Sequence, residues 1–172
     1  MDFINLIDYE ALEAQFGQIS EPVTEITEDL VRFCHNLAQV MYNHDGIGIA
    51  APQVGVNKRI IIIDCSPDKN ETLYLINPEI LWQSPQNSQK TEACLSYPGL
   101  KVPISRPKRI KVAGLGLSGE KIEFEATGLY ARCIYHEIDH LDGISFTRRA
   151  SRQVRRYLMR KWLKTNEYEQ EF

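Results

Sequence analysis

Residues 128–143 have the sequence "GLYARCIYHEIDHLDG", and this stretch decides the fold. Apolar residues recur at helical spacing around much of its circumference, and a glycine stands at each end. We therefore expect a helix that begins near Gly128 and ends at Gly143. A helix that is apolar on most sides has to be buried, so strands should wrap around it.

Two histidines in this helix have the spacing of metal ligands. His136 and His140 are four residues apart, and Glu137 directly follows the first of them. Residues at this spacing lie one turn apart on the same helix face, so two imidazoles can converge on one metal ion. A carboxylate beside them can take a proton from the attacking water as general base. The pattern predicts a metal-dependent hydrolase.

A catalytic metal site of this kind needs a third protein ligand. Every Glu after His140 lies in the polar tail, and Phe146 stands where one class of peptidase has a further histidine. The remaining candidates are the cysteines, which are Cys34, Cys65, Cys94 and Cys133. Three of them follow the spacing of core helix or strand residues. The other, Cys94, lies in the polar segment "TEACLSYPG", whose composition alone leaves its role open.

The other segments predict an α+β fold. Two further helices are expected, an N-terminal one over 28–43 with Thr27 as N-cap and a C-terminal one over 151–164. The β-branched runs and alternating patterns predict strands over 59–65, 72–78, 110–117 and 121–128. The order of helix, strands and helix, with hairpin-like connections, favours antiparallel or mixed sheets wrapped around the central helix over a doubly wound fold.

The composition predicts one soluble domain over residues 1–172. The chain has 172 residues and a net charge of −3, and 43% of its residues are hydrophobic, as in ordinary globular proteins. The opening sequence is not typical of a secretion signal, and no apolar run is long enough to span a membrane. We therefore expect a cytoplasmic protein with reduced cysteines, and a monomer.

The segment "DGIGIAAPQVG" at 45–55 is rich in small residues and precedes a predicted strand. It lacks the glycine spacing and the following helix of a nucleotide-binding loop. Small residues in an extended segment let a second backbone approach closely, so a peptide could be added here as a strand. A tight loop packed on the core explains the composition equally well.

Three stretches together make the chain resemble the bacterial-type peptide deformylases. The family pattern is GxGxAAxQ, then EGCLS, then HExxH, and this chain has "GIGIAAPQ" at 46–53, "EACLS" at 92–96 and "HEIDH" at 136–140. "RIIIID", "LINPEI" and "HLDG" extend the resemblance over nearly the whole length. The resemblance implies an enzyme that removes the formyl group from N-formylmethionine at the start of nascent polypeptides and releases formate.

The resemblance also assigns roles to individual residues. It implies one divalent metal ion, usually Fe²⁺ in this family and otherwise Zn²⁺, Ni²⁺ or Co²⁺, on Cys94, His136 and His140. It makes Glu137 the general acid and base, and it gives the Gln53 side chain and the Leu95 N–H as donors to the formyl oxygen. The peptide would lie along Ile47 and Gly48, and Leu129 and Cys133 would wall the pocket for the methionine side chain.

Ala93 departs from the family pattern, which usually has Gly at that position. If the backbone there needs a positive φ, Ala93 costs about 1 kcal/mol. If the position only lies close to the bound peptide, the extra methyl narrows the site or shifts the substrate preference. One alternative is therefore a weakened relative that binds N-terminal peptides without efficient turnover, and a less favoured one is a metallopeptidase. Near Ala93, Glu92 either pairs with Arg106 and fixes the cysteine loop or is an ordinary surface residue.

The two ends of the chain carry the last predictions. Residues 6–23, "LIDYEALEAQFGQISEPV", are expected to form a strand or loop leading into the first helix. Residues 148–164 hold eight of the 20 Lys and Arg residues and no acid. Such a stripe is either a solvated helix face or a phosphate-binding surface. The resemblance favours docking to ribosomal RNA, through Arg152, Arg155, Arg156 and Arg160.

Overall fold

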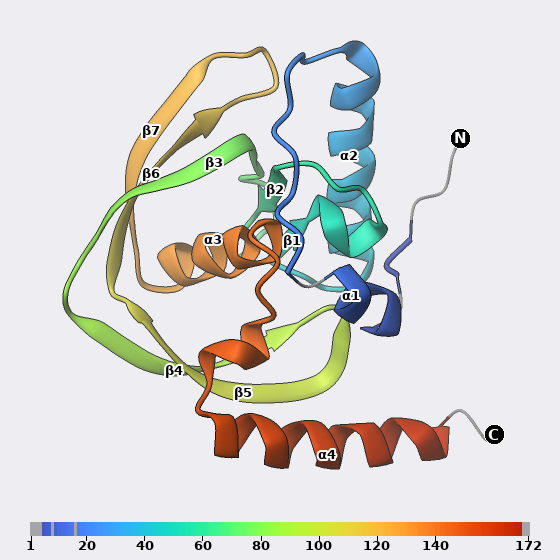
Figure 1. Cartoon of the computed structure of the whole chain (residues 1–172). Coiled ribbons are helices and arrows are strands. Elements are labelled where there is room, and N and C mark those ends of the chain that lie inside the picture. The colour runs from blue at the N-terminus through green and yellow to red at the C-terminus, as the bar shows by residue number, and fades with distance from the viewer. Residues whose placement is uncertain (1–4, 8, 16, 170–172) are drawn as a thin grey trace.

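The structure is a computed structural model that describes residues 5–7, 9–15 and 17–169. It confirms the predicted α+β class, with helix α3 in the middle of the molecule and strands curving around it (Figure 1). The helices are α1 (Tyr9–Gln15), α2 (Glu28–Asn43), α3 (Gly128–Leu141) and α4 (Arg152–Glu169), with short 3₁₀ helices η1 (Ala51–Val54) and η2 (Phe146–Arg149). The strands are β1 (Gly48–Ala50), β2 (Ile60–Ile63), β3 (Leu73–Gln83), β4 (Asn87–Cys94), β5 (Tyr97–Pro107), β6 (Arg109–Leu115) and β7 (Lys121–Thr127).

The strands form two antiparallel sheets. The larger sheet has the order β1-β2-β3-β6-β7, and β4 and β5 form a separate two-stranded ribbon. Strand β3 is longer than predicted from the sequence, and register shifts between Ile76 and Glu79 and between Ile80 and Trp82 interrupt its pairing with β6. Bulges of this kind bend a strand, which fits the curvature of the sheet around α3 in Figure 1.

The apolar run of β2 is continuous because both of its faces are covered. Ile61 and Ile63 belong to the core cluster that surrounds α3, whereas Ile60 and Ile62 pack in the cluster under α2. Successive side chains of a strand point to opposite faces, so each helix receives every second isoleucine. Strand β2 and its edge neighbour β1 are thereby fixed between the two helices.

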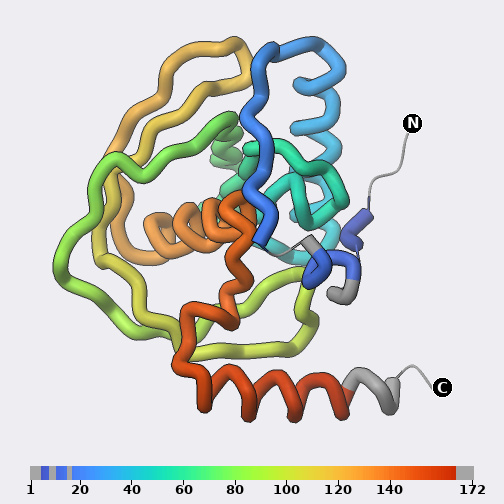
Figure 2. Tube along the Cα trace, in the orientation of Figure 1, coloured from blue at the N-terminus to red at the C-terminus, as the bar shows by residue number. Residues whose placement is uncertain are grey.

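Helix α3 has the predicted position and burial. Its apolar side chains Ala131, Ile134, Ile138 and Leu141 pack against the larger sheet. The helix ends because Gly143, at φ +67°, takes a left-handed conformation. The segment before α2 covers this end of α3, since Ser20 N–H donates to Leu141 O at 2.7 Å. Figure 2 shows the chain before α2 passing over the end of α3.

The N-terminal prediction of a strand or loop is wrong for residues 9–15, which form α1. Leu12 on this helix is 1% exposed and packs in a third cluster with Tyr97, Phe146 and Trp162. Only one strongly apolar position is therefore needed to hold the helix in place. The prediction for α2 is confirmed, including the N-cap, because Leu30 N–H donates to Thr27 Oγ1 at 3.2 Å.

Helix α4 lies along the β4–β5 ribbon, on the side away from α3 (Figures 1 and 2). Its Trp162 is 8% exposed, and the indole N–H donates to Pro98 O at 2.7 Å. The basic helix is thus anchored to the start of β5, shortly after Cys94. Among the described residues, no helix combines the length and apolar character needed to cross a membrane.

Candidate metal centre

The structure brings the three predicted metal ligands together. Cys94 ends β4, and His136 and His140 lie one turn apart on α3. One ligand atom of each residue lies within 4.8 Å of the other two, and Cys94 Sγ is 3.4 Å from His140 Nε2. All three side chains are buried. They come from segments more than 40 residues apart, so the tertiary fold is what forms the cluster.

The cluster fits a divalent transition-metal ion. Ligand atoms on a tetrahedral ion with bonds of about 2.0–2.3 Å are about 3.3–3.7 Å apart, close to the spacing here. One thiolate and two imidazoles suit several such ions and leave one coordination position open. One buried atom of a residue next to the ligands, Glu137 Oε2, has no hydrogen-bond partner among the described residues. Buried polar atoms seldom stay unpaired, which fits a site built for further ligands.

Glu92 hydrogen-bonds to the ring nitrogen of His136 that faces away from the cluster. Glu92 Oε2 lies 3.0 Å from His136 Nδ1, which leaves Nε2 to face the cluster. Glu92 Oε1 accepts hydrogen bonds of 2.6 Å from Arg106 Nε and from Arg132 Nη1. The Glu92–Arg106 pair is therefore as predicted from sequence, and it is buried on both sides. It fixes the end of β4, which presents Cys94.

Sequence reasoning missed the rest of this network. Arg106 Nη1 donates to Asp139 Oδ2 at 2.7 Å, and Arg149 also pairs with Asp139. The Tyr135 ring lies against both guanidinium groups, with centroid distances of 5.1 Å and 5.6 Å. One signal was available, because Arg132 precedes His136 by one helical turn and shares its buried face.

The network sets the charges around the ligands. Burial raises the pKa of Glu92, but hydrogen bonds and charges from Arg106 and His136 outweigh it and hold that pKa well below its usual range. For His136, burial favours the neutral ring, whereas Cys94 and Glu92 favour the cation and raise its pKa to about 10. Burial and nearby positive charge lower the pKa of His140. The surroundings of His136 thus stabilise positive charge, as a metal ion requires.

Glu137 lies next to the ligands in a dry environment. Burial raises its pKa to about 7, although the positive charges of His136 and Arg106 act in the opposite direction. A carboxyl group with a pKa near neutrality can both accept and return a proton at that pH. The group therefore has the properties of a general acid and base.

Gln53 points its amide nitrogen at the cluster. Its Oε1 accepts a hydrogen bond of 2.8 Å from Ala50 N–H, which fixes the orientation of the amide. Its Nε2 lies 3.1 Å from Ser96 Oγ and 3.6 Å from Cys94 Sγ. The amide N–H₂ therefore faces the space beside the thiol as a hydrogen-bond donor.

A pocket of about 450 Å³ opens beside these groups, a volume typical of small-ligand sites. Strand β1 forms one wall and α3 another. The sequence-predicted site residues on its lining are Ile47, Gly48, Gln53, Cys94, Leu95, Leu129, Cys133, His136 and Glu137. His140 is buried and is not among the lining residues. Apart from His140, the predicted ligands, base, donors and peptide-binding positions thus surround one cavity.

Ala93 also lines this pocket, but without the strain considered above. Among the described residues, the non-glycine positions with positive φ are Asp45, Lys69 and Asn77. Ala93 is therefore outside the left-handed region that favours glycine. The backbone at this position accepts alanine, and the condition for a penalty of about 1 kcal/mol is not met.

Gly48 is expected to be intolerant of a side chain. A Cβ at this position would lie 2.5 Å from Cys133 Sγ and 2.6 Å from Glu137 Oε1. We expect Gly48→Ala to lower the free energy of unfolding by about 1–3 kcal/mol, measured by urea unfolding. Adding Cys133→Ala should recover part of this loss. If Gly48→Ala alone is as stable as the parent chain, the packing of Cys133 and Glu137 against Gly48 is not tight.

Comparison with known proteins identifies relatives of the whole domain. A profile described as polypeptide deformylase matches residues 9–156. A peptide deformylase of Thermodesulfovibrio yellowstonii is 48% identical over 148 residues, which cover 85% of this chain and 88% of that protein. The crystal structure of a Legionella pneumophila peptide deformylase is similar with a TM-score of 0.86 and 32% identity, covering 98% of this chain and 97% of that one. The crystal structure of a Synechococcus elongatus peptide deformylase in complex with actinonin is similar with a TM-score of 0.85 and 36% identity. The match covers 92% of this chain and 86% of that one.

Proposed function

The chain belongs to the polypeptide deformylase family and removes the N-formyl group from nascent peptides, and we propose that it does so at Cys94, His136, His140 and Glu137. The observation that carries this assignment is the convergence of three buried ligand atoms beside a carboxyl group whose pKa is about 7. The enzyme is a hydrolase of a linear amide, and its products are formate and a peptide with a free amino terminus.

Peptide deformylases are metalloenzymes, and we propose that Cys94, His136 and His140 bind one divalent ion. Fe²⁺ is our proposal for the ion in the cell, and the same donor set is chemically suited to Zn²⁺, Ni²⁺ or Co²⁺. The ion supplies Lewis acidity, which lowers the pKa of a water and polarises the formyl carbonyl. Glu92 supports the site by fixing the His136 ring.

Glu137 moves the protons of the reaction. As a carboxylate it takes a proton from the attacking water, and as an acid it delivers that proton to the departing amine. Negative charge develops on the formyl oxygen during the attack. Gln53 Nε2 and the Leu95 N–H are proposed to donate hydrogen bonds to this oxygen, and donors fixed in advance lower the barrier.

The peptide is proposed to lie along β1. This strand is at the edge of the larger sheet, and its one sheet neighbour is β2. A peptide that pairs with Ile47 and Gly48 would add a strand to this edge. Leu129 and Cys133 on α3 would then contact the methionine side chain from the opposite wall. Leu129 is 57% exposed here, which leaves apolar surface for a ligand to cover.

The two alternatives considered from the sequence receive no support. A metallopeptidase of the known classes would need a histidine or glutamate as third ligand, whereas the cluster contains Cys94. The case for a weakened relative from backbone strain at Ala93 fails because φ there is not positive, and the extra methyl, which lines the pocket, is left as its one basis. We place the reaction in the cytoplasm because nascent formylated chains are its substrates.

Formate release tests the function directly. The enzyme, loaded anaerobically with Fe²⁺, should release one formate per molecule of a formyl-Met-Ala-Ser peptide and leave its internal peptide bonds intact. The unformylated peptide serves as control and should not change. Metal-loaded enzyme that releases no formate, or that cuts between the residues, would contradict the proposal.

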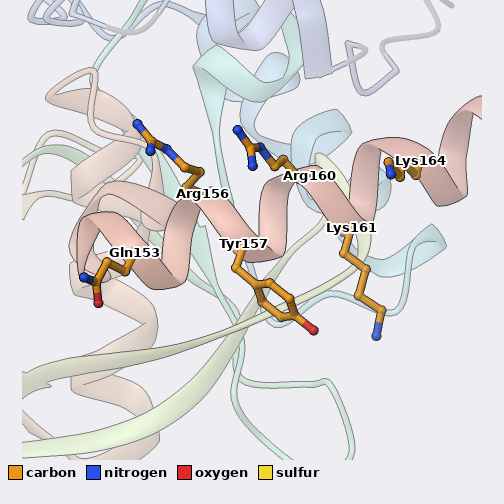
Figure 3. A pocket seen from close by; sticks show the side chains of 6 residues that line it. All are labelled: Gln153, Arg156, Tyr157, Arg160, Lys161 and Lys164. Atoms are coloured by element: carbon orange, nitrogen blue, oxygen red, sulfur yellow. The ribbon is translucent and has the colours of Figure 1, made fainter.

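Helix α4 carries a basic surface, defined here as Arg156, Arg160, Lys161 and Lys164 with Tyr157 and Gln153. Figure 3 shows Arg156 and Arg160 together on one side of the helix, and Tyr157 and Lys161 on another. Arg155 is half-buried and does not line this surface. We propose that the basic surface binds the phosphates of ribosomal RNA, which would place the enzyme near emerging chains.

Charge removal is the right test of this docking, because Trp162 ties α4 to Pro98 and deleting the helix would disturb the pocket. We expect the triple variant Arg156→Gln, Arg160→Gln and Lys161→Gln to reduce the fraction of the enzyme that co-sediments with ribosomes. The slope of log K against log salt should fall by roughly 1 for each lost phosphate contact. Lys121→Gln, on the exposed start of β7, is the matched control. Binding that is insensitive to salt would contradict the proposal.

A further inference from the structure

Two thiols of the chain meet at the strand along which the peptide is proposed to lie. The carbonyl oxygen of Ile47 accepts a hydrogen bond of 2.9 Å from Asp64 N–H and one of 3.3 Å from Cys133 Sγ. Cys65 directly follows Asp64, so the backbone at Ile47 brings Cys65 and Cys133 to the same place. Cys65 packs against the core cluster that contains Cys133, and each thiol acts on the pKa of the other.

The segment that carries Cys65 is held firmly. Asp64 accepts hydrogen bonds from Ser66 N–H at 2.9 Å, from Ser66 Oγ at 2.6 Å and from Tyr42 OH at 2.6 Å. Glu71 N–H donates to the same carboxylate at 3.2 Å. Cys65 lies between two residues that are fixed to each other, so little conformational freedom is lost when its thiol reacts with a neighbour.

The two thiols differ in accessibility. Cys133 is 6% exposed and packs against Gly48, whereas Cys65 is only half-buried. A small oxidant therefore reaches Cys65 first. The neighbouring Cys133 thiol lowers the pKa of Cys65, although burial opposes this, and the thiolate is the reactive form. Neither sulfur belongs to the proposed ligand set.

We propose that Cys65 and Cys133 are a redox-active dithiol that closes to a disulfide when a peroxide oxidises Cys65. The Cys65 thiolate attacks one oxygen of the peroxide, the O–O bond breaks, and Cys65 becomes a sulfenic acid as water or an alcohol leaves. The Cys133 sulfur then attacks the Cys65 sulfur, the S–O bond breaks, and a second water leaves. Two thiols lose two electrons in total and the peroxide gains them, and a dithiol reductant restores both thiols.

Closure would change the peptide edge. Once bonded to Cys65, the Cys133 sulfur has no S–H and can no longer donate to Ile47 O. It also leaves its place against Gly48, where it forms part of the pocket wall. On the proposed function, in which Ile47 and Gly48 bind the peptide, the disulfide weakens substrate binding without removing a metal ligand. We expect KM to rise about tenfold, a loss of about 1.4 kcal/mol in substrate binding, because the peptide edge and the pocket wall are displaced, with metal content unchanged.

The test uses the zinc-loaded enzyme, because Zn²⁺ has no redox chemistry of its own. The protein is treated with a small excess of hydrogen peroxide, which is then removed with catalase. Intact mass should fall by about 2 Da, and peptide mapping should find Cys65 joined to Cys133. Dithiothreitol should restore the mass and KM. No fall in mass, separate oxidation of the two sulfurs, or a disulfide that includes Cys94 would overturn the proposal.

Two variants sharpen the result. Cys65→Ser should be active, should show no fall in mass and should keep its KM after peroxide. Cys34→Ser is the matched control, since Cys34 is a fully buried residue of α2, and it should behave like the parent chain under peroxide. The mass readout needs no deformylase activity, so failure of the proposed function would not hide the disulfide. A disulfide that leaves KM unchanged would overturn its link to the peptide edge.

Discussion

Replacing Glu137 with alanine is expected to lower kcat for formate release about 10²–10⁴-fold and to leave one metal ion bound per chain. The side chain is 4% exposed, and burial raises its pKa to about 7, so it is suited to accept and return a proton. It is not in the ligand cluster of Cys94, His136 and His140. Its loss should therefore remove proton transfer and retain the site.

Two further variants separate this role from a structural one. Glu137→Gln keeps the shape of the side chain and removes the base, so its kcat should fall as far as that of the alanine variant. Glu125→Ala removes an exposed carboxylate on β7 and should keep full activity. Metal content is measured by elemental analysis. A Glu137→Ala enzyme with normal kcat would refute the role assigned to this residue.

Replacing Glu92 with alanine is expected to have the largest effect on stability. Glu92 is 6% exposed and pairs with Arg106 and Arg132, both of which are buried. Removing it leaves the buried Arg132 without its carboxylate partner and Arg106 with Asp139 alone, at a cost of about 3–5 kcal/mol in the free energy of unfolding. Metal affinity should also fall about 10–100-fold, because His136 loses the partner of its Nδ1.

Urea unfolding and metal titration measure these two effects. Glu123→Ala is the matched control, because Glu123 forms an exposed ion pair with Lys111 and should contribute little. Glu92→Ala with the stability of the parent chain would show that Arg106 and Arg132 find other partners. Such a result would also remove the reason to regard the buried network as the support of Cys94.

The same carboxylate makes stability depend on pH. The pKa of Glu92 is lower in the folded chain than its value of about 4.3 in the unfolded chain, so the unfolded state binds the proton more tightly. The stabilisation by Glu92 is therefore present above about pH 4.3 and is lost as the pH falls below that value. In Glu92→Gln this loss should be smaller than in the parent chain.

The helices with regular spacing were predictable from sequence because local rules determine them. Thr27 caps α2 as expected, and α3 begins at the predicted residue. The alternation around "SGE" predicted the β6–β7 hairpin correctly. Helix α1 was missed because its position depends on the burial of Leu12 in a cluster assembled from distant segments. The full length of β3 was missed because its second half is half-exposed and bulged.

The candidate site was predictable to a different degree. Helical spacing alone indicated His136, Glu137 and His140, but the residues left Cys94 open, and only the resemblance to a family singled it out. The charged network was largely invisible, since Arg132, Asp139 and Arg149 look like surface residues in a sequence. The burial of Arg132 and Asp139 arises because the ribbon folds onto α3, and no local pattern encodes that contact. The concern over Ala93 required the backbone φ, which a sequence does not give.

The β4–β5 ribbon described above has a consequence for how the molecule can change over evolution. A two-stranded ribbon is marginally stable by itself. Here the ion pairs of Glu92 and Arg106 with α3, and Trp162 of α4, attach it to the rest of the molecule. The side chains that organise the reaction centre are therefore also the ones that keep a piece of the chain folded. A substitution among them lowers both the turnover of the enzyme and the amount of folded protein. A descendant that only binds peptides would therefore first need other contacts that attach the ribbon to the rest of the molecule.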